Sequence, residues 1–275
     1  MINDVNKLTG KEPGQTSIIL VGVHGNEQCG VEALKKLLPT LSISRGTVLF
    51  ILGNPKALGA NARYIEANLN RMFNSSEAAL VKYKHTYEYK RAQYLKKYLN
   101  ESDVLLDIHA SSIQNSRVFA ICEPNAKEIV KYLPTDTVVS GFDDVEPGGT
   151  DYYMNSIGKV GICFECGYMN DSKSIQMAEE AILSFLKARR HLDEPVKAKD
   201  QQYIKMYYKY FSKTKDFVLD KPFENFESVK EGQIIGNDGI QEIVTPKDSY
   251  ILFAHNSKNI GEEVFLLGGQ RESLE

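Results

Sequence analysis

Short apolar runs alternate with helical patterns along the first two thirds of the chain. Each run is continuously apolar, which is typical of strands that are covered on both faces of a sheet. The runs are 17–23, 47–52, 103–110, 117–122 and 160–166. Between and after them, apolar residues at helical spacing predict helices over 28–38, 76–100, 125–132 and 173–191. This alternation predicts an α/β fold, in which helices cover a mostly parallel mixed sheet.

The pattern changes near residue 195, in the segment LDEP. Short strand-like pieces separated by the turn signals EGQ, GNDG and TPKDS then indicate an all-β unit. We therefore predict an α/β domain over 1–195 and a small all-β domain over 196–275. The segments VKEGQIIG and GEEVFLLG are similar to biotin and lipoyl carriers, but no lysine lies in a methionine-flanked turn. We interpret the C-terminal domain as a lid over the site.

Composition and charge exclude several classes of protein. The 275 residues are 42% hydrophobic and 25% charged, as in a soluble globular protein. The formal net charge is −3 and the basic residues are scattered, so the sequence shows no basic patch for nucleic acid or an anionic membrane. No apolar run approaches the roughly 20 residues of a membrane span, and the N-terminal stretch lacks the apolar core of a signal peptide. We expect a cytoplasmic protein, for which the sequence allows a homo-oligomer.

Four cysteines, Cys29, Cys122, Cys163 and Cys166, do not suggest a disulfide framework in a chain of this length. Cys163 and Cys166 form a C-x-x-C pattern, which could indicate redox chemistry or half of a zinc site. However, they lie in VGICFECGY, which is a strand pattern rather than the helix start of a thioredoxin-like site. We interpret them as small apolar side chains of a core strand.

His24 and Glu27 stand three residues apart, where an apolar run ends and a helical pattern begins. These residues alone leave two interpretations open: a turn with a helix cap, or two ligands of one metal ion. Gly25 between them lets the backbone turn sharply. A catalytic zinc usually takes three protein ligands from His, Asp and Glu and keeps a fourth position open. The metal interpretation therefore requires a third ligand elsewhere in the chain.

His109 is a candidate for the third ligand. It lies at the end of the run DVLLDIHA, and ligands of α/β sheets bind beyond the carboxyl ends of the strands. Asp107 shares a strand face with His109, because side chains alternate along a strand. Its carboxylate could accept a hydrogen bond from a ligand histidine and fix the orientation of the ring. A core histidine paired with Asp107 is the alternative.

Glu165 is the candidate acid/base residue. It interrupts the apolar stretch GICFECGY, where a carboxylate is costly unless it is paired or functional. Arg63, Asn70 and Arg71 crowd the loop-like segment NPKALGANARYIEANLNRMF. Arginine presents a fork that matches carboxylates and stabilises an oxyanion, so these residues near a zinc would suit an anionic amide substrate. Taken alone, such arginines are more often surface residues.

With these motifs in order, the chain resembles the succinylglutamate desuccinylase/aspartoacylase family, relatives of the zinc carboxypeptidases. The motifs are HGNE, NPKA, RYIEANLNR, DIHA and FECG, within about residues 17–170. The resemblance implies a zinc-carboxypeptidase-like sheet, a C-terminal β unit and one zinc per chain. It also implies roles for individual residues: His24, Glu27 and His109 hold zinc, Glu165 is the general acid/base, Arg63 polarises the scissile carbonyl, and Asn70 with Arg71 holds a substrate carboxylate.

Two positions depart from the family pattern. Asn68 stands where family members commonly have aspartate, and Asn155 stands where aspartoacylases carry an arginine that grips the amino-acid carboxylate. N-acetylaspartate is therefore not the expected substrate, and a less acidic or differently shaped N-acyl compound is favoured. Asn155 and Arg117 are candidate substrate-binding residues, with Arg117 as a substitute positive charge.

Three functions are weighed on these residues. The first is a zinc-dependent amidohydrolase that removes an acyl group from a small N-acyl amino acid or similar amide. This function uses every motif, and its expected partner is a small substrate that carries a carboxylate. The second is a zinc carboxypeptidase acting on short peptides, since the ligand set is shared. The third is a binding protein that keeps zinc and a ligand without chemistry. A C-terminal unit that caps the site would favour small molecules over peptides.

Overall fold

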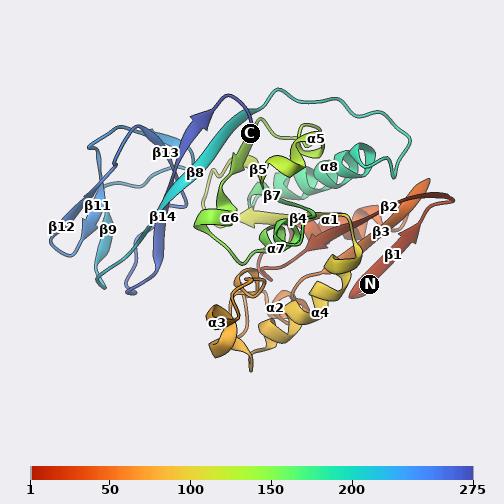
Figure 1. Cartoon of the computed structure of the whole chain (residues 1–275), viewed down its shortest axis with the longest axis horizontal. Coiled ribbons are helices and arrows are strands. Elements are labelled where there is room, and N and C mark those ends of the chain that lie inside the picture. Colours follow the sequence, from red (N-terminus) through yellow and green to blue (C-terminus); the bar gives the residue numbers. More distant parts are fainter. Residues whose placement is uncertain (1, 275) are drawn as a thin grey trace.

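A long mixed sheet forms the centre of the molecule (Figure 1). The structure is a computed structural model, and it describes residues 2–274. Within these residues, eleven strands lie in the order β1-β3-β2-β4-β7-β5-β6-β8-β14-β13-β10. The strands of the first part are β1 (Val5–Thr9), β2 (Glu12–Val21), β3 (Arg45–Leu52), β4 (Val104–Ser111), β5 (Val118–Cys122), β6 (Thr137–Ser140) and β7 (Val160–Tyr168). The five predicted strands are all present, and the predicted α/β fold class is confirmed.

Strands β3, β2, β4 and β7 are neighbours that run parallel to one another. Strand β1 pairs antiparallel with β3, and β5 pairs antiparallel with β7, so the sheet is mixed. Because β2, β4 and β7 are adjacent and parallel, their carboxyl ends meet at one edge of the sheet. The segments that follow these three strands are therefore brought together, although they are far apart in the sequence.

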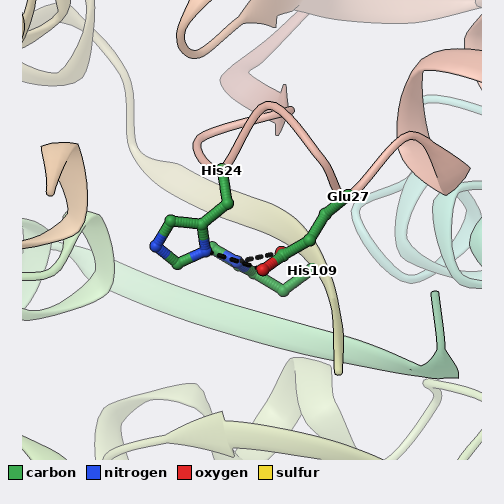
Figure 2. Close-up of side chains that lie close together, drawn as sticks. All are labelled: His24, Glu27 and His109. Atoms are coloured by element: carbon green, nitrogen blue, oxygen red, sulfur yellow. Dashed lines mark hydrogen bonds and ion pairs between the residues drawn. The ribbon is translucent and has the colours of Figure 1, made fainter. Parts of the chain in front are cut away.

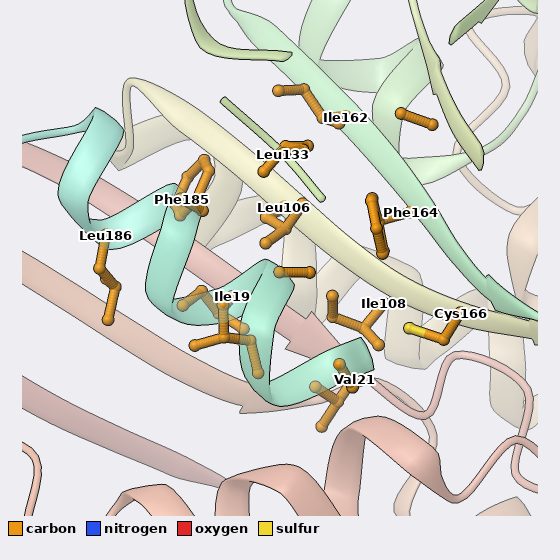
Figure 3. Packing of buried hydrophobic residues seen from close by; sticks show 14 of the residues in the cluster. Ile19, Val21, Leu106, Ile108, Leu133, Ile162, Phe164, Cys166, Phe185 and Leu186 are labelled. Atoms are coloured by element: carbon orange, nitrogen blue, oxygen red, sulfur yellow. The ribbon is translucent and has the colours of Figure 1, made fainter. Parts of the chain in front are cut away.

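Helices cover both faces of this sheet, which explains its continuously apolar strands. Helices α1 (Cys29–Leu37) and α8 (Lys173–Ala188) pack over one face, where Ile19, Ile108 and Phe164 meet Phe185 (Figure 3). Helix α4 (Tyr87–Glu101) packs over the other face. Shorter helices are α2 (Pro55–Ala60), η1 (Leu69–Arg71), α3 (Glu77–Leu80), η2 (Val81–Tyr83), η3 (Pro124–Ala126), α5 (Lys127–Val130), α6 (Phe142–Val145) and α7 (Thr150–Ser156).

The single helix predicted over 76–100 is divided in the structure. Helices α3 and η2 end before Thr86, and α4 begins at Tyr87. The Thr86 hydroxyl accepts a hydrogen bond from the Tyr89 N–H at 3.2 Å, so it caps α4 and fixes its start. The other predicted helices are present with shifted ends, as α1, as η3 with α5, and as α8.

Up to residue 274, the part of the chain after the LDEP segment near 195 forms strands and connections and no helix. They are β8 (Gln202–Phe211), β9 (Phe217–Leu219), β10 (Glu227–Val229), β11 (Ile234–Asp238), β12 (Gln241–Val244), β13 (Ser249–Leu252) and β14 (Glu263–Arg271). Strand β8 pairs parallel with β6, so the large sheet continues into this C-terminal unit. Strands β9, β11 and β12 form a separate sheet. A small all-β unit follows the α/β part, while the boundary at 195 stays a prediction.

Two further observations bear on the sequence-based expectations. All four cysteines are free and buried, and Cys163 and Cys166 lie on β7 among apolar side chains, in keeping with a core role. Among residues 2–274, no helix is long and apolar enough to cross a membrane.

Glu88, near the start of α4, holds the loop that precedes η1. Its side chain is fully buried, and its carboxylate accepts hydrogen bonds from the N–H groups of Ile65, Glu66 and Ala67 at 2.8, 3.2 and 3.1 Å. The side-chain amide of Asn54 donates to the same carboxylate at 3.3 Å. A single carboxylate thus fixes the backbone between Arg63 and η1.

We expect Glu88→Ala to lower the free energy of unfolding by about 2 kcal/mol or more, because backbone donors lose their acceptor. Urea unfolding measures the change. Glu101→Ala, at the exposed end of the same helix, is the matched control. A Glu88→Ala protein as stable as the Glu101→Ala protein would contradict this role.

Candidate active site

His24, Glu27 and His109 meet at the carboxyl edge of the sheet (Figure 2). Nδ1 of His24 lies 2.8 Å from Oε1 of Glu27, and Nδ1 of His109 lies 2.9 Å from Oε2 of the same carboxylate. One ligand atom from each residue falls within 4.8 Å of the others. The three residues are 4%, 4% and 3% exposed, respectively. We refer to them as the His-Glu-His triad.

The sheet and one glycine, Gly25, determine where the backbone places this triad. His24 lies just beyond β2 and Glu27 just before α1, while His109 lies near the end of the neighbouring β4. A Cβ atom on Gly25 would lie 2.0 Å from the carbonyl carbon of Ala57, so no other residue fits there without a backbone shift. The glycine expected for a sharp turn is thus also required for space, because the loop packs against α2.

The ring nitrogens that face away from Glu27 also have polar neighbours. Nε2 of His24 lies 3.1 Å from Oδ1 of Asn68, and Nε2 of His109 lies 3.1 Å from Oδ2 of Asp107. The contact of His109 with Asp107 is an ion pair, since Nε2 of His109 has no hydrogen bond within residues 2–274. In the metal-bound protein, a proton on Nε2 of each ring, beside these oxygens, would leave the Nδ1 lone pair for the metal ion. The Thr150 hydroxyl donates to Asp107 Oδ2 at 2.5 Å and orients that carboxylate in turn.

The charges of the triad and of Asp107 shift one another's pKa values. Burial alone would raise the pKa of Glu27, but the charges of His24 and His109 outweigh burial and lower it. Burial lowers the pKa of His24. Burial would also lower the pKa of His109, yet the charges of Asp107 and Glu27 raise it well above its usual value. A buried carboxylate between two imidazoles fits a divalent cation, and two nitrogens with one oxygen suit zinc.

Glu165 lies on β7 beside this triad. Its backbone pairs with that of His109 on β4, and its side chain is 9% exposed. Burial, reinforced by the negative charges of Glu27 and Asp107, raises the pKa of Glu165 to about 7. Its Oε2 atom is buried and has no hydrogen-bond partner within residues 2–274. A carboxyl group with a near-neutral pKa can both accept and donate a proton at neutral pH.

Arg63 and Asn68 reach the triad from the loop that Glu88 holds. Nη1 of Arg63 donates to Glu27 Oε1 at 3.2 Å, and the Arg63 side chain remains 49% exposed. The Arg63 side chain therefore extends from the buried triad to the solvent. Asn68 accepts from the Asn70 N–H at 3.0 Å while it contacts His24.

Asn70 and Arg71 follow on η1. The side-chain oxygen of Asn70 accepts from the Thr150 N–H at 3.3 Å, and Nη1 of Arg71 donates to the Asn70 carbonyl at 2.9 Å. Nη2 of Arg71 donates to Glu146. The part of the chain from Arg63 to Arg71 thus passes beside the triad and ends at a half-exposed guanidinium.

Asn155 and Arg117 are not brought to the triad. The Asn155 amide donates to Asp143 at 3.0 Å and accepts from Asn125 at 3.0 Å and from the Gly161 N–H at 3.2 Å. Gly161 lies at the opposite end of β7 from Glu165. The exposed Arg117 lines a surface hollow with Pro134, Thr135, Asp136, Lys199 and others. Within residues 2–274, neither side chain has a hydrogen bond or ion pair with the triad.

Sequence reasoning missed Thr150, Glu88 and Glu146. Thr150 follows two glycines at the start of α7, and nothing in that pattern indicates that it reaches Asp107. Glu88 has the sequence context of an ordinary acidic residue in the first turn of a helix. The Asn68 position was noticed as a departure from the family, but its contact with His24 was not anticipated.

Comparison with known proteins identifies the family of this chain and is consistent with its fold. Residues 13–192 match the family model of the succinylglutamate desuccinylase/aspartoacylase catalytic domain. The match covers more than half of the chain, and the chain belongs to this family. The family is named for enzymes that remove acyl groups. The resemblance seen in the sequence motifs is therefore confirmed.

Individual relatives cover nearly the whole chain. Succinylglutamate desuccinylase from Shewanella sp. (strain MR-4) is 25% identical over 273 residues, which span 89% of this chain and 79% of that protein. The X-ray structure of succinylglutamate desuccinylase from Vibrio parahaemolyticus is 20% identical and has a TM-score of 0.80, with 97% of this chain and 86% of that chain covered.

A third similar structure is the product-bound ectoine utilization protein EutE (DoeB) from Ruegeria pomeroyi. It is 19% identical, with a TM-score of 0.74, and 96% of this chain and 88% of that chain are covered. At these identities, the two solved structures support the fold and leave the substrate open.

We expect His24→Ala and His109→Ala each to weaken zinc binding at least about a hundredfold, more than the loss of an orienting neighbour costs. Competition with a chromophoric chelator measures the affinity without any substrate. His255→Ala removes an exposed histidine and is the control. Zinc affinity that is unchanged in a folded His109→Ala protein would exclude His109 as a ligand.

Proposed function

We propose that the protein is a zinc-dependent amidohydrolase that removes the acyl group from a small N-acyl amino acid or a similar amide. One observation carries the proposal: a buried carboxyl group, Glu165, whose Oε2 atom has no hydrogen-bond partner within residues 2–274, lies beside the buried His-Glu-His triad at the same sheet edge. Membership of a deacylase family supports the same reaction class. In this proposal, His24, Glu27 and His109 hold one zinc ion per chain.

Zinc bound there would lower the pKa of a water molecule and polarise the amide carbonyl. Glu165 then acts as the base that accepts a proton from the attacking water. It returns this proton to the leaving nitrogen as the carbon–nitrogen bond breaks, which gives a carboxylic acid and an amine. A pKa of about 7 suits both halves of this proton transfer.

Arg63 is proposed to stabilise the carbonyl oxygen as negative charge develops on it. Its guanidinium contacts Glu27 and is half-exposed, so it borders both the triad and the space that a substrate would enter. A guanidinium directed at a developing oxyanion favours the transition state over the bound substrate. The part of Asp107 in this proposal is to hold the His109 ring through its Nε2 atom.

Asn70 and Arg71 are proposed to bind a carboxylate of the substrate, since Arg71 ends the segment that passes the triad. The C-terminal unit is proposed to border this part of the site. The observation in favour is that Lys209 on β8 contacts Glu146, the partner of Arg71, at 3.0 Å. A site bordered in this way favours small amides over the peptides of a carboxypeptidase.

We expect Glu165→Gln to lower kcat at least about a hundredfold while zinc remains bound, because an amide cannot carry the proton from water to the leaving nitrogen. Steady-state hydrolysis and metal analysis on the same sample measure both effects. Glu180→Gln, an exposed acid on α8, is the control. Full activity of the Glu165→Gln protein would remove Glu165 from the mechanism.

We expect the zinc-loaded protein to hydrolyse members of a panel of N-acetyl, N-succinyl and N-formyl amino acids and to leave dipeptides intact. The His24→Ala protein serves as the blank in this assay. Cleavage of dipeptides alone would assign the protein to the peptidases. Binding without turnover of any compound would instead indicate a zinc-dependent binding protein.

A further inference from the structure

Four ionisable side chains from distant parts of the chain meet beside the proposed carboxylate subsite. Glu146, which follows α6, accepts from Arg71 through Oε2 and from Lys209 on β8 through Oε1, the latter at 3.0 Å. Glu263 on β14 adjoins Glu146, and each carboxyl group affects the ionisation of the other. We call Arg71, Glu146, Lys209 and Glu263 the Glu146 cluster.

The two acids of the Glu146 cluster carry one negative charge between them at neutral pH. Burial would raise the pKa of Glu146, but the contact with Glu263 and the charges of Arg71 and Lys209 lower it, so Glu146 is ionised. Burial and the contact with Glu146 raise the pKa of Glu263 to about 9, so Glu263 is neutral. Its Oε2 atom is buried without a hydrogen-bond partner within residues 2–274, a position that would be costly for a full charge.

The charge that remains for a ligand is therefore small. Arg71 and Lys209 contribute two positive charges and Glu146 cancels one of them, which leaves a net charge of one. The terminal nitrogens of Arg71 also donate within the chain, Nη1 to the Asn70 carbonyl and Nη2 to Glu146. A substrate carboxylate at Arg71 thus shares the guanidinium with a carboxylate of the protein. A second carboxylate would face Glu146 with no further cation of the cluster to balance it.

We propose that Glu146, whose carboxylate contacts both Arg71 and Lys209, is a specificity-determining residue that selects amides whose amine portion carries one carboxylate over those that carry two. This inference rests on the proposed function, because it assumes that the amine portion lies at Arg71. It narrows the substrate class to N-acyl amino acids with an uncharged side chain.

The shared charge has a consequence that distinguishes selection from a purely structural ion pair. If Glu146 is replaced by glutamine, Glu263 can ionise beside Arg71 and Lys209 and restore the single negative charge. Only removal of both carboxyl groups leaves two uncancelled cations. Selectivity is therefore expected to change most in the double variant, whereas Glu263→Gln alone removes a carboxyl group but no charge.

N-acetylglutamine and N-acetylglutamate are the probes, since they have nearly the same shape and differ by one carboxylate. We expect wild type and Glu263→Gln to favour N-acetylglutamine to the same degree in kcat/KM. We expect Glu146→Gln/Glu263→Gln to shift the ratio toward N-acetylglutamate by about tenfold or more, as one partly screened charge would. The shift should appear mainly in KM, and Glu146→Gln alone should show a smaller one. Glu231→Gln, an exposed acid of the C-terminal unit, is the control.

Dissociation constants of both amides for the zinc-loaded proteins in a Glu165→Gln background separate this inference from the proposed function. If no protein that retains Glu165 hydrolyses either amide, the proposed reaction is wrong. The ratio of dissociation constants in the Glu165→Gln background still reports charge selection in that case. An unchanged ratio in the folded double variant, or a lack of binding of both amides to every protein, would overturn the inference. If the double variant does not fold, Lys209→Met replaces it, and N-acetylglutamine binding that does not weaken there would also overturn it.

Discussion

The site depends on a single buried carboxylate, that of Glu27. Its two oxygens contact His24, His109, Arg63 and the Ala110 N–H, so one side chain ties together β4, the loop after β2 and the loop before η1. Burial disfavours an isolated negative charge, and the neighbouring imidazoles offset this cost. The geometry of the site is thus held by the charge that a metal ion would neutralise.

The three strands that carry the site could be predicted from the sequence because their signal is local. Strands covered on both faces must be continuously apolar, and His24, His109 and Glu165 are polar residues at or near the ends of such runs. Their meeting point follows from the rule that carboxyl ends of neighbouring parallel strands share an edge. What the sequence could not supply is that β2, β4 and β7 are neighbours in that order, since strand order is decided by distant contacts.

The residues that sequence reasoning missed act through such distant contacts. Glu88 looks like any acid in the first turn of a helix, yet it binds three amides of a loop more than twenty residues earlier. Asn155 is a candidate from the sequence because it stands where aspartoacylases carry an arginine that grips the amino-acid carboxylate. Helix α7 instead places it at the other end of β7, where its amide is occupied by Asp143 and Asn125. Spacing along the chain does not give direction in space.

The pairing of β8 with β6 has a consequence for how a substrate would enter. The C-terminal unit forms backbone hydrogen bonds with the α/β part through β8 and β6. The two parts also share an apolar core, which includes Phe119, Ile204 and Leu266. The C-terminal unit therefore has a fixed position relative to the α/β part, since a rigid-body movement of this unit would break the pairing of β6 with β8. In the proposed reaction, substrate entry and product release would depend on the motions of side chains such as Arg63 and Arg71, which are faster than domain closure.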